Sequence, residues 1–118
     1  MGFRFEELDV YKESLDFANE IYNITKRYPK TEIFGTVNQI RRAAMSVSQN
    51  IAEGSGRTKK EFRHFLDMAR TSLYECIPLL EISKIQGYIN TADFDKLYER
   101  CNILAKRLNA LKNSIREP

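Results

Sequence analysis

The chain has 118 residues, of which 42% are hydrophobic and 30% charged, and its formal net charge is +3 at pH 7. This length and composition predict one globular domain over residues 1–118, and they exclude a disordered or fibrous chain. No apolar run approaches the ~20 residues of a membrane span and no secretion signal opens the chain, so we expect a cytoplasmic protein with no membrane partner.

The first predicted helix covers about residues 7–28 and ends before Pro29, since proline cannot continue a helix. Two apolar stripes with helical spacing lie side by side on it. One is a heptad seam, and the other lies beside it, which indicates burial against two neighbours, within a bundle or between subunits. The seam is Leu8, Tyr11, Leu15, Ala18 and Tyr22, and the second stripe is Val10, Phe17, Ile21, Ile24 and Tyr28.

The second predicted helix begins between Ile33 and Thr36 and ends near Glu53. Gly54 is expected as the residue just past its C-terminus, within a Gly-Ser-Gly turn. Its many small residues allow another helix to approach closely. The apolar seam of this helix is Val37, Ile40, Ala44, Val47 and Ile51.

Thr58 and Glu61 form a capping-box pattern that begins a long third helix, which runs to about Gln86. Its main seam includes Leu66, Leu73 and Leu80, and Pro78 in its middle predicts a kink. After a turn at residues 87–91, with Asn90 or Thr91 as the N-cap, a fourth helix runs to about Ile115. Its seam is Phe94, Leu97, Cys101, Leu104, Leu108, Leu111 and Ile115. Short turns between four helices predict an all-α, antiparallel up-down-up-down four-helix bundle.

The basic excess is concentrated in residues 33–64, which hold six Lys or Arg and two Glu. This predicts a phosphate-binding surface on the hairpin of helices two and three. The alternative is structural, because adjacent arginines on a helix point about 100° apart, so that one is solvated and the other pairs internally. The candidate nucleic-acid contacts are Arg41, Arg42, Arg57, Lys59, Lys60, Arg63 and His64, and the candidates for internal pairing are Arg42, Asn50, Glu53 and Glu75.

No pattern indicates catalysis, a cofactor or a metal site. His64 is the sole histidine, and it has no nucleophile or acid placed beside it in the sequence. Cys76 and Cys101 form no CxxC pair and lie on helix seams, so we expect them to be buried structural thiols. The chain is therefore expected not to be an enzyme.

The stretch from residue 39 to residue 57 resembles the 23S rRNA intervening-sequence protein family, a family of four-helix bundles. The similarity lies in residues 39–44 (QIRRAA), 46–47 (SV), 50–54 (NIAEG) and 56–57 (GR). Tyr11 stands where the family often has tryptophan. The resemblance implies assembly into a ring, commonly a homopentamer. A related accessory protein of diversity-generating retroelements, which is similar to the family in fold, binds nucleic acid through a basic surface.

Two functions are therefore expected from the sequence. The first is a non-enzymatic homo-oligomer that binds RNA or DNA through the basic hairpin. The second is a structural or adaptor ring that binds a protein partner, in which Arg41 and Arg42 serve in the interface or in internal pairing.

Overall fold

The structure, a computed structural model, describes residues 2–116, and no strand occurs in this range. Four helices dominate it: α1 (Asp9–Thr25), α2 (Asn38–Ser55), α3 (Lys59–Ile85) and α4 (Thr91–Ser114). A short helical turn, η1 (Arg4–Glu7), precedes α1, and two more, η2 (Lys30–Glu32) and η3 (Ile33–Val37), connect α1 to α2. The all-α four-helix bundle is thus confirmed.

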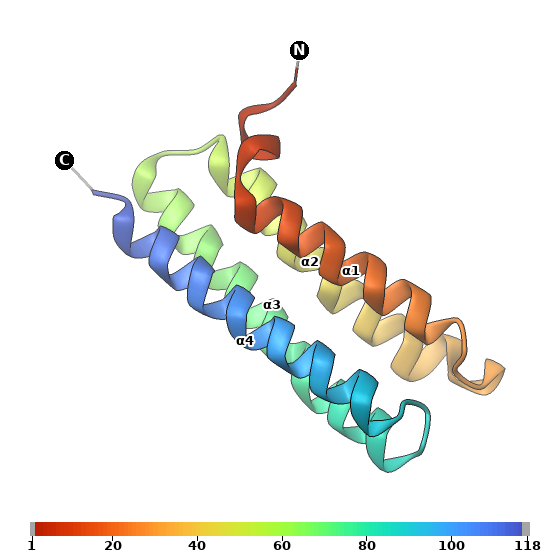
Figure 1. The fold of residues 1–118 in the computed structure, drawn as a ribbon. Helices are drawn as coiled ribbons and strands as arrows, with labels where there is room; N and C mark the ends of the chain where they lie inside the picture. Colours follow the sequence, from red (N-terminus) through yellow and green to blue (C-terminus); the bar gives the residue numbers. More distant parts are fainter. Residues whose placement is uncertain (1, 117–118) are drawn as a thin grey trace.

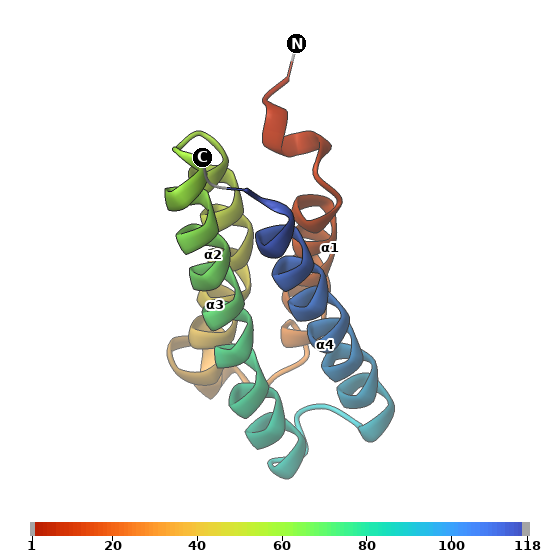
Figure 2. The same cartoon turned by 90° about the vertical axis from the view of Figure 1, so that its left-hand side faces the viewer.

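The helices follow one another around the bundle. Each packs against the next, α1 also contacts α4, and the contact between α2 and α3 is the most extensive. Figure 1 shows successive helices side by side, with short turns at alternate ends. The turn η1 and the end of α4 lie at the end of the bundle that holds the α2–α3 turn, as Figure 2 also shows. The molecule is elongated, about 49 × 26 × 21 Å.

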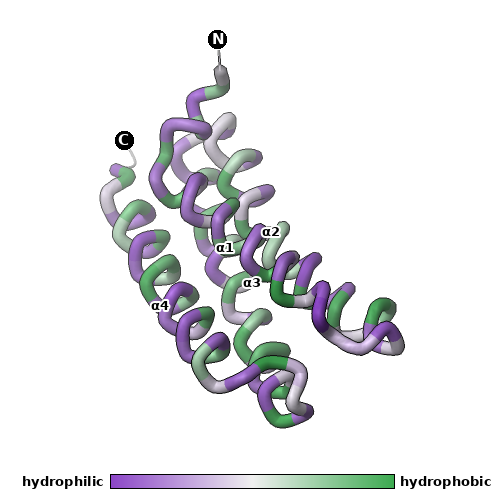
Figure 3. Tube along the Cα trace, turned by 45° about the vertical axis from the view of Figure 1, so that its right-hand side comes forward, coloured by the Kyte–Doolittle hydropathy of each residue, from purple (hydrophilic) through white to green (hydrophobic). Residues whose placement is uncertain are grey.

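Most of the core comes from the seams that the sequence predicts for the last three helices. All five residues of the second predicted seam, at the end of η3 and in α2, are buried, as are Leu66, Leu73 and Leu80 of α3 and Leu97 and Leu108 of α4. Figure 3 shows hydrophobic and hydrophilic positions alternating along each helix, which is the pattern of helices with one apolar side.

On α1 the buried stripe is the second of the two, containing Phe17 and Ile21. Leu15 and Tyr22, on the predicted heptad seam, remain 42% and 36% exposed. Both stripes have helical spacing, and the position of α2 and α4 around α1 decides which of them is covered. Leu15 and Tyr22 thus stay on the outside of α1, while Ala18 of the same seam is buried.

Helix α1 ends at Thr25, three residues before the predicted end. Its last turn tightens, because the N–H groups of Arg27 and Tyr28 donate to carbonyls three residues back. Tyr28 is then buried just before Pro29, whose ring disfavours a helical conformation of the preceding residue.

The predicted N-caps of the last two helices are confirmed. The Glu61 N–H donates to the Thr58 hydroxyl at 3.2 Å, and the Asp93 N–H donates to the Asn90 side chain at 2.7 Å. Between these helices Gly87 has φ +77°, a left-handed conformation that glycine adopts without steric cost. The next N–H, that of Tyr88, donates back to the Ser83 carbonyl and closes the end of α3.

Helix α3 continues through Pro78 as one α-helix. Proline supplies no N–H to the carbonyl one turn earlier, and Pro78 lies on the exposed side of the helix, where water can take that place. The kink at this residue stays a prediction.

Five buried serine and threonine hydroxyls bond within their own helix. Each donates to a main-chain carbonyl three or four residues earlier, so these five donors are satisfied. They are Ser14, Thr25, Ser48, Ser72 and Ser83.

Cys76 and Cys101 are both buried and unpaired, which confirms the expectation of buried thiols. Burial raises the pKa of Cys101 to about 12 and also raises the pKa of Cys76, because the thiolate form loses its hydration in the core. Both thiols therefore stay protonated and act as small apolar groups.

Charged side chains join α1 to α4 along one side of the bundle. Glu13 pairs with Arg107, and Glu20 pairs with both Lys96 and Arg100. At the far end Arg27 of the α1–α2 connection lies 3.6 Å from Asp93. These pairs are partly exposed, so each is worth about 1 kcal/mol or less.

Gly54 is not the residue past the end of α2, as the sequence predicts, but a buried residue inside the helix, which ends at Ser55. A Cβ atom at this position would lie 2.4 Å from the Phe65 Cβ on α3. Glycine is required here because the two helices approach closely beside the turn.

We expect Gly54→Ala to destabilise the fold by about 1–3 kcal/mol, the usual cost of overpacking a core contact. The measurement is the free energy of unfolding from urea denaturation followed by circular dichroism. Gly56→Ala is the matched control, because the nearest atom to its added Cβ is the Glu53 carbonyl oxygen at 3.9 Å. Equal effects of the two substitutions would contradict the close-approach explanation.

Candidate nucleic-acid interface

The α2–α3 hairpin carries every site residue that the sequence predicts, and its helices are joined by a polar contact midway. The hydroxyls of Ser46 on α2 and Ser72 on α3 lie 2.9 Å apart. The Asn50 side chain donates to the Ser46 carbonyl at 2.8 Å and to its hydroxyl at 3.1 Å. Asn50 therefore bonds to Ser46 of its own helix, and small side chains set the spacing of the helices here.

Arg41 points toward α1. Its Nε donates to the Thr25 hydroxyl at 2.9 Å, and an Nη donates to the Tyr22 carbonyl at 3.3 Å. The guanidinium carbon also lies 4.6 Å from the centre of the Tyr22 ring, a cation–π contact. The Tyr22 carbonyl belongs to the last turn of α1, where it also accepts from the Thr25 hydroxyl at 3.2 Å. Arg41 thus caps the C-terminal end of α1, and its partners are a carbonyl, a hydroxyl and a ring.

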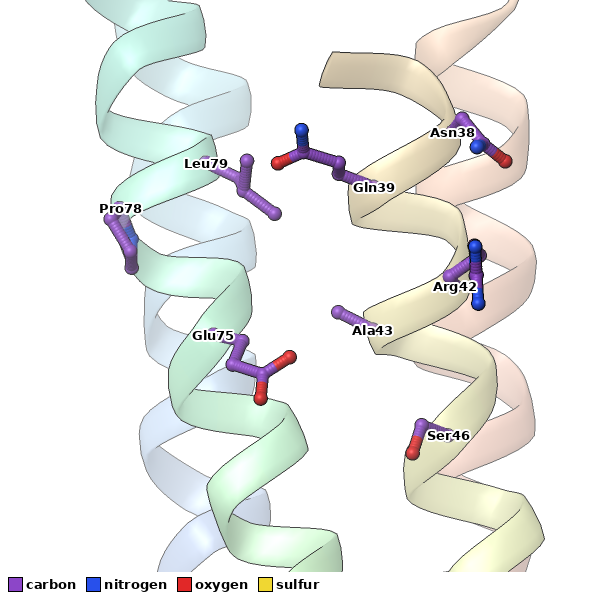
Figure 4. Close-up of a pocket in the computed structure, with 8 residues that line it drawn as sticks. All are labelled: Asn38, Gln39, Arg42, Ala43, Ser46, Glu75, Pro78 and Leu79. Carbon is purple, nitrogen blue, oxygen red and sulfur yellow. The ribbon is translucent and has the colours of Figure 1, made fainter. Parts of the chain in front are cut away.

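Arg42, one residue later, is exposed, and none of the hydrogen bonds or ion pairs among residues 2–116 involves its side chain. It lies on the rim of an open groove of about 600 Å³ between α2 and α3. Figure 4 shows Glu75 and Leu79 reaching from α3 toward α2, and Gln39 reaching back from α2. Glu75 forms no ion pair with Arg42, so this groove has a carboxylate on one wall and a guanidinium on the other.

Arg57 in the turn is neutralised by two carboxylates. It pairs with Glu53 at 2.7 Å and with Glu61 at 3.5 Å, one turn before and after it. Its guanidinium carbon lies 5.2 Å from the centre of the Phe65 ring. Hydrogen bonding to Thr58, with a contribution from Arg57, lowers the pKa of Glu61 from its ordinary value, so this carboxylate is ionised at neutral pH.

Lys59, Lys60 and His64 are exposed on the first turns of α3. Neither lysine forms an ion pair or hydrogen bond with any described residue. His64 contacts Phe65, with the ring centres 6.2 Å apart. The two lysines are therefore the cations of the hairpin turn that keep their charge uncompensated.

Arg63 reaches the end of α4. Its guanidinium donates to the Lys112 carbonyl at 2.7 Å and to the Ile115 carbonyl at 3.1 Å. Both carbonyls lie at the C-terminal end of α4, where that of Lys112 also accepts from the Ile115 N–H at 3.2 Å. Arg63 thus fixes the C-terminus of α4 to the start of α3.

The predicted basic set is divided by the fold. Arg41 and Arg63 cap other helices, and Arg57 is held between two glutamates. Arg42 lies about 20 Å along α2 from the turn, at 1.5 Å of rise per residue, so it is separate from Lys59 and Lys60. Two distinct cationic points remain in place of one continuous patch.

Two cations that the sequence reasoning left out, Arg4 and Arg116, lie beside Arg57 and Lys59. Nothing near either residue in the sequence signals this. In an up-down bundle of four helices, the first and last segments lie beside the α2–α3 turn. The predicted helix order could therefore have placed Arg4 and Arg116 there.

Within residues 2–116 no group of three or more His, Cys, Asp or Glu side chains is arranged to hold a metal ion. In the same range no helix is both long enough and apolar enough to cross a bilayer.

The model of a protein family described as "23S rRNA-intervening sequence protein" matches residues 6–110, nearly the whole chain. The chain belongs to this family. The chain is also similar to a solved structure, a protein of unknown function from the S23 ribosomal protein family of Bacteroides thetaiotaomicron. The two share 23% identity over 89% of this chain and 99% of the other, with a TM-score of 0.78. This likeness concerns the fold. No protein with a curated description matches the chain.

Arg41→Ala is expected to destabilise the protein by about 1–3 kcal/mol, because two hydrogen bonds from a charged donor are lost and the end of α1 is uncapped. Arg42→Ala removes the same side chain one residue later, where it has no partner among the described residues, so the change should stay within about 0.5 kcal/mol. Thermal unfolding monitored by circular dichroism distinguishes the two. A larger loss in Arg42→Ala would reverse the assignment of the structural arginine.

Proposed function

We propose that this protein is a non-enzymatic, cytoplasmic homo-oligomer, a homopentameric ring, that binds RNA or DNA phosphates at the α2–α3 hairpin. The observation that carries the proposal is the pair Lys59 and Lys60, adjacent, exposed and without an anionic partner among residues 2–116. Ammonium groups in this state attract phosphates and release counterions when they bind.

The chain belongs to a family that is named after an intervening sequence of 23S rRNA, which supports nucleic acid as the partner. The charge distribution agrees, since the segment 33–64 holds the basic excess while residues 1–32 are acidic overall. Arg42 supplies a second exposed cation on the same hairpin. A strand that contacts both points would run along the outside of α2.

Self-association is supported by exposed apolar side chains where η3 meets α1. Phe34 is 93% exposed, and together with Ile33 and Tyr22 it surrounds a hollow of about 370 Å³. An exposed cluster of this kind is typical of a protein–protein contact. Leu15, on the same helix as Tyr22, is a further exposed apolar side chain.

The same surface supports the second candidate function, an adaptor ring that binds a protein partner and has no nucleic-acid role. Arg42 borders this surface as well as the α2–α3 groove, and Glu75 on the opposite wall of the groove would repel phosphate. In that case the hairpin lysines serve only solubility.

The double substitution Lys59→Ala/Lys60→Ala should weaken RNA binding and lower the slope of log affinity against log salt by about 1.4–1.8, which corresponds to two lost phosphate contacts. The measurement is fluorescence anisotropy with a labelled ribosomal RNA fragment across a salt series. Lys26→Ala/Lys30→Ala removes two exposed lysines at the opposite end of the bundle and is the control. Absence of binding by the unmodified protein at low salt would sink the nucleic-acid proposal.

Light scattering should give a mass five times that of the chain at micromolar concentration. Phe34→Ser should shift the protein toward smaller species, because it removes the most exposed aromatic side chain of the apolar surface. Phe3→Ser, which changes an exposed phenylalanine at the other end of the bundle, is the control and should leave the mass unchanged. A monomeric mass for the unmodified protein would contradict the ring.

A further inference from the structure

A pocket of about 450 Å³ lies at the end of the bundle where the chain termini meet the α2–α3 turn. We call it the terminal pocket. Four separate segments form it: η1 and the start of α1, the end of α2 with its turn, the first turn of α3, and the end of α4. Figures 1 and 2 show these segments gathered at one end of the molecule. Its volume is in the range of small-ligand sites.

The apolar part of the terminal pocket is formed by half-buried side chains, two of them aromatic. These are Phe5, Leu8, Phe62 and Ile115. The Phe5 ring is held in place by an edge-to-face contact with Tyr11, with ring centres 4.9 Å apart. A flat ligand can therefore stack on an aromatic surface that is already positioned.

The polar part is cationic. Arg4, Arg57, Lys59 and Arg116 line the pocket, and the described lining includes no carboxylate. Arg57 is shared with Glu53 and Glu61, whereas the side chains of Arg4 and Lys59 have no hydrogen-bonded or ionic partner among the described residues. The pocket thus presents positive charge beside an aromatic floor.

Two serine hydroxyls add acceptors to this lining. Ser55 donates to the Ala52 carbonyl at 2.8 Å, and Ser114 donates to the Leu111 carbonyl at 2.7 Å. Because each hydroxyl hydrogen is already used within its helix, the oxygens are left to accept hydrogen bonds from a ligand.

We propose that the terminal pocket holds one unpaired nucleotide of a nucleic-acid strand, with the base on Phe5 and Phe62 and the phosphate on Arg4 and Lys59. This inference rests on the proposed nucleic-acid function and names the form of strand that the hairpin binds. A base must leave its stack to enter such a pocket, which unpaired loops and ends permit and a duplex does not. The protein therefore selects single-stranded over double-stranded segments.

The first test compares a labelled single-stranded oligonucleotide with a duplex of the same length at constant salt. Phe5→Leu keeps the apolar volume and removes the ring, so it should weaken single-strand binding about 10-fold and leave duplex binding unchanged. Arg4→Ala should also weaken single-strand binding, and Lys30→Ala, with the same loss of charge at the opposite end of the bundle, should not. Circular dichroism of each variant establishes that the helices are intact.

The second test locates the ligand. Adenosine 5′-monophosphate should shift the amide resonances of Phe5, Ser55 and Phe62 in NMR spectra, and inorganic phosphate should shift them less. Decanoate tests for an aliphatic anion in the same place, and its binding without that of the nucleotide would overturn the proposal.

The outcomes separate the two proposals. If oligonucleotides bind and Phe5→Leu binds them as well as the unmodified protein does, the terminal pocket is not the base site, while the hairpin proposal stands. If no oligonucleotide binds even at low salt, the proposed function fails and the pocket inference fails with it.

Discussion

The close approach of α2 and α3 is the constraint on which the rest of the structure depends. It requires a glycine opposite Phe65 near the turn and serine hydroxyls in contact midway. Small side chains at these points let the helices pack closely, and the dispersion attraction between their atoms accumulates over the length of the pair. The turn is thereby held against the start of α3, so Lys59 and Lys60 project from a rigid support.

The cations of the hairpin are divided by side-chain chemistry. Arg41 and Arg63 each satisfy carbonyls at the end of another helix, a task that suits a planar guanidinium with several fixed donors. Lys59 and Lys60, whose compact ammonium groups are strongly hydrated, stay in solvent. Positive charge in this segment therefore serves two purposes, joining helices and presenting charge outward, and only the second is available to a phosphate.

Local signals in the sequence predict the helices and their caps well, but they predict poorly which helix faces pack against one another. The heptad of α4 and the N-caps Thr58 and Asn90 are correct because each depends on residues within a few positions. The heptad seam of α1 is the less buried of its two stripes, since both have helical spacing and only the arrangement of α2 and α4 decides which is covered.

The candidate site is subject to the same limit. Gly54 has the sequence context of a residue past a helix end, yet its role is set by Phe65 across the hairpin. Arg41 and Arg42 differ only by a rotation of about 100°, and the sequence contains no local mark of which one faces α1. Arg63 finds its partners 49 and 52 residues away, where no short-range pattern reaches.

Ion pairs of Glu13 and Glu20 join α1 to α4, and one ion pair, between Asp67 and Lys112, joins α3 to α4. The bundle is held by close packing along the α2–α3 pair, and ion pairs join the opposite edge between α1 and α4. Salt weakens partly exposed ion pairs and leaves apolar packing in place, so rising ionic strength loosens the α1–α4 edge before the α2–α3 pair. Phe17 and Leu104 lie beneath Arg100 and Arg107 at that edge. They are the core side chains that water reaches first when α1 and α4 begin to separate.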